Sequence, residues 1–546
     1  MHSLSDRPRR PYDARRRAFA LLLALLPALG AAAQGQPVPV PLDADTPLVL
    51  TLDEAVQIAL VSNYAVRGDR LSIENAEAQV REAWGQVLPQ VDASASYTRN
   101  LKSANPFAGS AAGGLFGSLG FVDWLAFNER ARTDEDPGTV PIAFPEFQDR
   151  QAQGLREAGI SLGGSDNPFA VENQFQNGLT VTQTLFNGSA FAAISGAERL
   201  KDINRKGLAR QEQLIVDEVR RSFYQALLAQ AQAGVVESSV GRTAATLSET
   251  ARRVAQGVAP KFQRTSAEVT LANLETQLVQ VQTQAATALD QLKFTLGIPV
   301  AQPVRLRGSL AVDEADLYRQ VSVAGAYAAA LERRPDLDQA RLAVELREID
   351  RRITRAEYLP RLSAFANLSY SGSVPDDRSF TVADPDDPFS FTRRDNTFFS
   401  ESYWQPSVNV GMTLTWNLFN GFQTSARAQQ RQIAVEQARL DYARLEQGVR
   451  LEVETALRSL RAAYQQILSQ EQNVARAEEN YRMASVRLRE GVATPLEERD
   501  ASDLLDQSRL NYLQAVHDYL VARSAYETAL GLSPTRPADA NLTLNQ

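Results

Sequence analysis

Three acidic side chains recur at a spacing that suits one face of a helix. Glu497, Asp500 and Asp503 stand at positions i, i+3 and i+6. Residues at this spacing fall close to one side of a helix. Carboxylates gathered in this way attract cations and repel anions. The solvated face of any long helix often has the same spacing, so both interpretations stay open at this point.

Residue types that other kinds of chemistry need are scarce. The chain has no cysteine and only two histidines, His2 and His517. The lack of cysteine excludes a disulfide scaffold, a thiolate zinc site, a cysteine nucleophile and a lipidated N-terminal cysteine. So few histidines argue against a histidine triad or a multi-histidine metal site. No G-x-x-x-x-G-K-[ST] loop occurs. We therefore predict no catalytic residues, no metal, no cofactor and no enzyme activity.

The chain is long and acidic. It has 546 residues, 44% of them hydrophobic, and a formal net charge of -8. This length allows several domains or one large elongated unit. The acidic balance argues against a nucleic-acid partner, because nucleic-acid binders usually carry a basic surplus.

The first 33 residues have the order of a secretory signal peptide. Six arginines precede the apolar run AFALLLALLPALG, and the small residues Ala31-Ala32-Ala33 follow. We predict cleavage after Ala33 and an extended linker over residues 34–50. A membrane anchor is the alternative, but the run is short and contains Pro27. No other window holds 18 uninterrupted apolar residues, so entry into a membrane would require strands.

The chain contains two copies of one unit. Ala55 pairs with Ala326 at an offset of 271, the LFNG at residues 185–188 returns at an offset of 233, and the GVA at residues 257–259 returns at an offset of 234. Such self-similarity fixes the architecture before any secondary structure is assigned. It predicts a first repeat over 51–298, a connector over 299–325, a second repeat over 326–532 and a polar tail over 533–546.

Each copy begins with a helix and a pair of strands. Helices over 52–87 and 323–358 end at Leu-Pro, which cannot continue a helix. Four strands of about nine residues then alternate apolar with Ser, Thr or Asn side chains, which suits staves of a membrane β-barrel and equally suits a half-buried soluble sheet. Long polar loops, residues 99–177 and 371–405, join the strands of each pair. The longer loop contains a glycine-rich run, which predicts flexibility.

Each copy ends in a long helical hairpin. Residues 190–256 and 422–490 contain no proline, and a helix of that length would span about 100 Å. Apolar residues at alternating spacings of four and three predict coiled-coil seams. A turn at Gly257 or Gly491 sends a second helix back to a Leu-Gly end. The predicted seam residues are Val240, Ala244, Leu247, Ala251 and Val254 in the first copy and Val474, Ala477, Tyr481, Ala484 and Leu488 in the second.

Four strands cannot close a barrel by themselves. About eight strands are the minimum, and an open sheet edge cannot lie in lipid. Copies of the chain must therefore pool their strands, and either three or four copies would close a barrel.

The order of these motifs, given twice behind a signal peptide, resembles the TolC-type outer-membrane efflux proteins. The resemblance covers residues 48–532 and implies an α+β homotrimer. Its 12-stranded transmembrane β-barrel would lie in outer-membrane lipid and continue into a 12-helix coiled-coil tunnel in the periplasm. Such proteins are passive exit ducts of tripartite efflux or type I secretion systems. They work with a periplasmic adaptor and a proton-driven or ATP-driven inner-membrane pump.

The resemblance also implies roles for the hairpin tips. Arg253, Gly257 and Val258, and likewise Arg487, Gly491 and Val492, match the family's R-x-x-x-G-hydrophobic turn, which meets the adaptor. An exposed valine beside a tight glycine turn offers an apolar contact, although glycine serves the turn in any case. The first tip departs from the family pattern, because Pro260 and Gln263 replace a small hydroxyl residue and an aspartate.

The acids after the second tip match the family's closed periplasmic entrance. Glu497 and Asp500 stand six and nine residues after Gly491, where three copies of each would form a ring of carboxylates beside Asp503. The first repeat has Gln263 and Ser266 at these places, so the second repeat alone would build the ring. Candidate latches are the arginines of this region, Arg499, Arg487 and Arg264.

A second function class is compatible with the helices. A structural or adhesive coiled-coil protein of the cell surface would need only the heptad seams. Strands of barrel length at matching places in both repeats argue against it.

Overall fold

The structure is a computed structural model that describes residues 47–102, 120–134, 139–159, 171–312, 322–384 and 387–532. The predicted signal peptide and polar tail lie outside these residues, and the repeat boundaries stay predictions. The chain divides into two compact units. Unit 1 comprises Met1–Gly68, Gln211–Ala330 and Glu452–Gln546, and unit 2 comprises Asp69–Arg210 and Leu331–Leu451.

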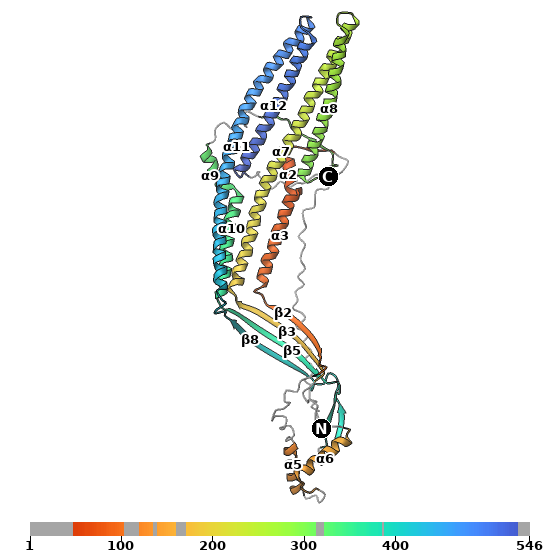
Figure 1. Ribbon diagram of the computed structural model, residues 1–546, viewed down its shortest axis with the longest axis vertical. Helices are drawn as coiled ribbons and strands as arrows, with labels where there is room; N and C mark the ends of the chain where they lie inside the picture. Colours follow the sequence, from red (N-terminus) through yellow and green to blue (C-terminus); the bar gives the residue numbers. More distant parts are fainter. Residues whose placement is uncertain are drawn as a thin grey trace, which may run out of the picture. The chain divides into compact units, whose positions relative to one another are not determined.

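Unit 2 contains a four-stranded antiparallel sheet. Its strands are β2 (Gln90–Arg99), β3 (Asn173–Phe186), β5 (Arg361–Val374) and β8 (Trp404–Thr415), in that order across the sheet (Figure 1). β2 and β5 start directly after the two predicted Leu-Pro breaks. The strands contain 10 to 14 residues, which is at least the 9 to 11 that about one bilayer thickness requires.

The register places apolar side chains on one face of all four strands. Val91 is paired with Val181, Val181 with Ala366, and Ala366 with Val410. On β8 the apolar side chains of this face are exposed, and Val410 is 77% exposed. An apolar sheet face of this kind needs a cover of lipid or protein. The other exposed members of the face on β8 are Val408, Met412 and Leu414. None of the described helices is long and apolar enough to cross a membrane.

Both predicted loops contain ordered elements. The first includes α5 (Gly120–Thr133) and α6 (Phe144–Glu157), and the second includes a hairpin of β6 (Ser379–Ala383) and β7 (Phe391–Asp395). The rings of Phe127, Phe147 and Phe389 lie within 5.2–5.7 Å of one another. The predicted polar loops therefore contain secondary structure, because aromatic residues from both repeats pack into a small core. Most of the glycine-rich run, residues 109–119, lies outside the described residues.

The helix before each strand pair is broken once. Asn63 separates α2 (Leu52–Ser62) from α3 (Tyr64–Gly85), because its Oδ1 accepts a hydrogen bond from the Ala65 amide at 2.8 Å and so caps the next helix. In the second repeat α9 (Val323–Arg333) ends before α10 (Pro335–Arg355), since proline starts a helix but cannot continue one. A short 3-10 turn, Ala356–Tyr358, follows α10. Each predicted single helix is thus two.

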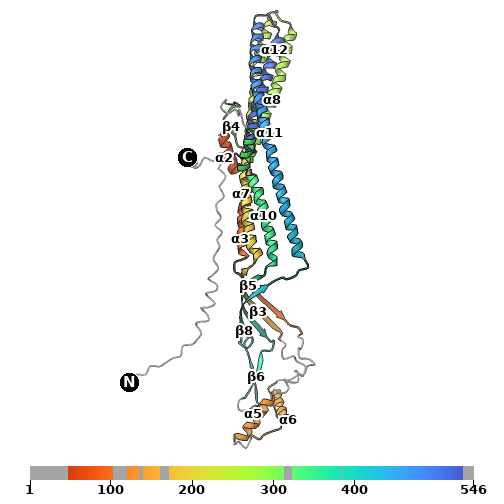
Figure 2. The same cartoon turned by 90° about the vertical axis from the view of Figure 1, so that its left-hand side faces the viewer.

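Unit 1 contains the two helical hairpins. The helices α7 (Gly188–Ala255) and α11 (Gln423–Arg489) enter it, and α8 (Lys261–Leu296) and α12 (Pro495–Ala529) return. Within this unit the two hairpins stand next to each other in Figure 1 and overlap in Figure 2, which is turned by 90°. Their bases share a core that includes the fully buried Phe223, Leu292 and Tyr519.

Two close backbone contacts stabilise the base of the first hairpin, where α8 ends and the connector begins. Gly297 ends α8 with φ 73°, and a Cβ there would lie 2.5 Å from the Ser62 carbonyl oxygen, so no other residue fits the predicted Leu-Gly end. The predicted linker is ordered at its end, where β1 (Leu48–Leu50) pairs in parallel with β4 (Val304–Leu306) of the connector.

The two predicted coiled-coil seams differ in how well their residues are buried. All five seam residues of the second copy are buried or half-buried. In the first copy Ala244 is exposed, whereas Ser239 and Thr250 are buried. The first seam was therefore wrong in part. In this distal part of α7, Arg242 and Thr246 make polar contacts with side chains of α12, in addition to the apolar residues that pack.

Candidate functional site

The two hairpin tips have the same backbone geometry. Gly257 and Gly491 both have φ 75°. The Val258 amide donates to the Arg253 carbonyl at 3.0 Å, and the Val492 amide donates to the Arg487 carbonyl at 2.9 Å, which is the hydrogen bond of a glycine-terminated helix. A Cβ on either glycine would meet no atom within 4 Å, so the backbone angle rather than crowding requires glycine there.

Each tip also exposes an apolar pair that its own fold does not explain. Val258 and Val492 are 72% and 66% exposed, and Phe262 and Leu496 are 69% and 54% exposed. The second member stands five residues after the glycine in both repeats. The sequence prediction missed Phe262 and Leu496, although the repeat offset of 234 relates them. Exposed apolar residues gathered at one place indicate an interaction surface.

Glu497 has a structural role at the start of α12. Its carboxylate accepts from the amide and hydroxyl of Thr494, and its amide donates to the Thr494 hydroxyl at 3.2 Å, which completes a capping box. Pro260 and Gln263 occupy the equivalent places of the first tip, where α8 has no side-chain cap. The departure of the first tip from the family pattern is therefore the loss of this capping box.

The other two predicted gate acids lie beside Arg499. Its guanidinium is 3.3 Å from Asp500 and 4.0 Å from Asp503. Arg487 lies 3.9 Å from Glu497, whereas Arg264 pairs with Glu268 of its own helix. Two of the three candidate latches thus contact the acids, and both contacts stay within the second hairpin.

A polar contact that the sequence prediction missed joins the two hairpins. Arg242 of α7 forms an ion pair with Asp506 of α12, and its Nε donates to the Ser502 hydroxyl at 3.2 Å. The Arg242 guanidinium also lies 5.8 Å from the Tyr481 ring centroid. Four residues further along α7, the Thr246 hydroxyl donates to Glu498 at 3.3 Å. No spacing in the sequence connects residues about 260 positions apart.

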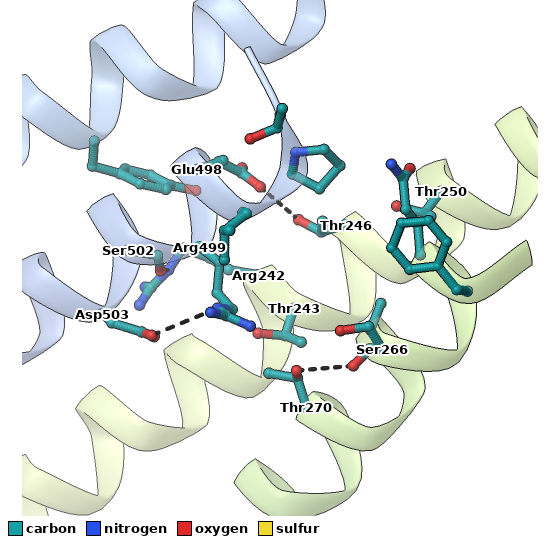
Figure 3. A pocket seen from close by; sticks show the side chains of 17 residues that line it. Arg242, Thr243, Thr246, Thr250, Ser266, Thr270, Glu498, Arg499, Ser502 and Asp503 are labelled. Carbon is teal, nitrogen blue, oxygen red and sulfur yellow. Dashed lines mark hydrogen bonds and ion pairs between the residues drawn. The ribbon is translucent and has the colours of Figure 1, made fainter. Parts of the chain in front are cut away.

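These contacts lie at a cleft of about 360 Å³ between α7, α8, α11 and α12 (Figure 3). Burial raises the pKa of the Glu498 carboxyl, although Thr246 and Arg242 oppose the change. Burial likewise raises the pKa of Asp503. The described residues contain no group of three or more metal-ligating side chains. The carboxyl groups of Glu498 and Asp503 therefore keep their protons to a higher pH than usual. The polar contacts around the cleft link one hairpin to the other.

The capping role of Glu497 leads to a test that separates charge from structure. Glu497→Ala should lower the stability of the start of α12 by about 1 kcal/mol, because both reciprocal bonds are lost. Glu497→Gln keeps a capping box and removes only the charge. Proteolysis of the second tip should therefore speed up in the alanine variant and not in the glutamine variant. Equal cleavage of the two variants would contradict the capping role.

Glu498 should make the hairpin contact sensitive to pH. An acid with a raised pKa contributes stability that is complete below its ordinary pKa and is lost as the pH rises through the raised value. Glu498→Gln should therefore raise the melting temperature at pH 7 and have little effect near pH 4. Thr246→Val removes a bond to the charged form and should lower the melting temperature at pH 7. An effect of Glu498→Gln that is equal at both pH values would rule out this explanation.

Comparison of the sequence with protein families identifies a family that covers most of the chain. The model of a family described as outer membrane efflux protein matches residues 150–298 and 326–532. Among curated proteins, none matches the chain in sequence.

Solved structures with a similar fold include three membrane proteins. CusC is similar with a TM-score of 0.62 and 18% identity over 91% of this chain and 98% of its own. The Campylobacter jejuni outer membrane channel CmeC gives 0.64 and 14% over 88% and 85%. The Vibrio cholerae outer membrane protein VceC gives 0.60 and 15% over 88% and 96%. The predicted α+β fold class is confirmed.

Proposed function

Because the chain belongs to the outer membrane efflux protein family, we propose that three copies of it form the exit duct of a tripartite export system. The protein is an outer-membrane efflux channel. As a channel it moves cargo passively, and the energy of transport must come from a pump in the inner membrane. The observation that carries the proposal is the four-stranded sheet with one apolar face, whose outer strands β2 and β8 each pair with only one of the other described strands.

The sheet supports assembly from several copies. β2 and β8 are its outer strands, and neighbouring strands in it are antiparallel. β8 of one copy can therefore pair in antiparallel fashion with β2 of the next, so that no edge meets lipid. Three copies make twelve staves with the apolar face toward lipid and the polar face toward a wet bore. A surface coiled-coil protein would not need such a sheet.

The tips support docking of a periplasmic adaptor. Each of them exposes an apolar pair at a glycine turn and the helix start that follows it, Val258 with Phe262 and Val492 with Leu496. Arg253 and Arg487 hold the turns through their carbonyl groups. The adaptor would cover these pairs, since apolar surface gains about 25 cal/mol for each Å² that it buries.

The second hairpin supports a periplasmic gate. In a trimer, Glu497, Asp500 and Asp503 would recur three times around the entrance and favour cations. Arg242 would hold α12 against α7 and so keep the entrance narrow. This role goes to Arg242, because the Arg499 and Arg487 contacts lie within one hairpin.

The oligomeric state tests the proposal. The purified protein should run as a trimer that only heating separates, and it should give discrete conductance steps in planar bilayers. A monomer that gives no conductance after reconstitution would overturn it. A tetramer that conducts would keep the duct and correct the number of copies.

A further inference from the structure

The polar face of the sheet has an almost uncharged lining. Its residues pair across the strands in rows, and most of them are hydroxyl or amide side chains. Of the rows that begin at the even-numbered residues of β2, four cross the whole sheet. They are Gln90, Thr182, Phe365 and Gly411; Asp92, Thr180, Asn367 and Asn409; Ser94, Gly178, Ser369 and Ser407; and Ser96, Gln176, Ser371 and Gln405.

Asp92 is the single ionisable side chain in these four rows. It stands on the exposed outer strand β2 and is paired with Thr180, whose next partner is Asn367. Among the paired strand residues of this face, the one basic side chain is Arg361, three rows away at the start of β5. No basic side chain in the four rows therefore neutralises the Asp92 charge.

We infer that Asp92 makes the exit bore prefer cations over anions. The inference rests on the proposed trimer, in which three Asp92 carboxylates recur at one level of the bore. Twelve strands about 4.8 Å apart and tilted by about 40° enclose a wall about 24 Å across. The centre of such a bore lies within about one Debye length of the wall at 0.1 M salt. Three uncompensated carboxylates there act on every ion that passes.

The one aromatic residue in these rows, Phe365, does not block the bore at the neighbouring level. Phe365 lies over Gly411, where a Cβ would be 2.7 Å from the ring Cζ. The ring thus rests against the wall of the sheet instead of projecting into the bore. Phe365→Leu is therefore a suitable control, because it changes the lining in the next row and leaves the charge unchanged.

Reversal potentials across a KCl gradient test the assignment. In planar bilayers, Asp92→Asn should lower the preference for K⁺ over Cl⁻ about twofold at 0.1 M, and the effect should fade at 1 M, where the Debye length is about 3 Å. Asp92→Glu and Phe365→Leu should keep the wild-type ratio. Thr180→Asp added to Asp92→Asn should restore it, because Thr180 stands in the same row.

The measurements are repeated in a Glu497→Gln, Asp500→Asn background. These changes remove the charges of the proposed periplasmic entrance, so that its ion selectivity does not mask that of the exit bore. Conducting trimers of Asp92→Asn with an unchanged ion ratio in both backgrounds would overturn the assignment. A wild-type protein that forms no conducting pore would instead overturn the proposed function. Recovery of the ratio in the Thr180→Asp double variant would show that the charge at this level, and not a folding defect, sets the preference.

Discussion

Arg242→Ala should loosen the contact between the hairpins and leave the duct permanently leaky. The Arg242 and Asp506 side chains are only 21% and 14% exposed. Removal of one partner from a pair so well covered costs about 3 kcal/mol, because the other charge is left without compensation. The hydrogen bond to Ser502 and the contact with the Tyr481 ring are lost as well. Thermal melting and single-channel conductance in bilayers measure the two consequences.

Matched variants distinguish the loss of this covered ion pair from the loss of an exposed one. Arg252 lies on the same helix and pairs with Glu249 at 2.6 Å, but its side chain is 70% exposed. Arg252→Ala should therefore change stability by less than about 1 kcal/mol and leave conductance unchanged. Arg242→Met combined with Asp506→Leu should regain most of the stability, because a well-packed apolar pair can replace a buried ion pair. If Arg242→Ala changed stability and conductance as little as Arg252→Ala, the contact of Arg242 with Asp506 would not hold the two hairpins together.

Aspartate in place of both tip valines should abolish export. Val258→Asp and Val492→Asp put a charge where the proposed adaptor would cover an apolar pair. Desolvation of such a charge costs at least about 3 kcal/mol, and 3 kcal/mol weakens binding more than 100-fold. Neither change should disturb the turns, because the valine amides rather than the side chains make the closing hydrogen bonds. Photo-crosslinking in the native cell, from Phe262 and Leu496, reports whether a periplasmic adaptor is still captured.

A charge that does not touch the apolar pair is the control. Gln256→Asp stands next to Gly257 and is exposed, so it should leave capture and export unchanged. The captured adaptor also identifies the system, since one encoded with a proton-driven pump indicates efflux of small molecules or metals and one encoded with an ATP-driven exporter indicates secretion. Full export by the double valine variant would remove the docking role of the tips.

Local patterns were enough to predict most of the architecture. The four alternating strands and the glycine turns depend on residues near one another in the chain, and the structure has both. The capping box of Thr494 and Glu497 was also within reach, because a Thr followed three residues later by Glu at a helix start is a local signal.

Contacts between distant segments needed the tertiary structure. The breaks after α2 and α9 have local causes in Asn63 and Pro335, but the long periodic pattern around them concealed both. The aromatic core of Phe127, Phe147 and Phe389 joins insertions of the two repeats, and the Arg242 contact with Asp506 joins α7 to α12. Periodicity shows which face of an element is apolar, but not which partner that face meets. The polar contacts between α7 and α12 and the cross-strand row that contains Asp92 therefore emerged only from the packed helices and the paired strands.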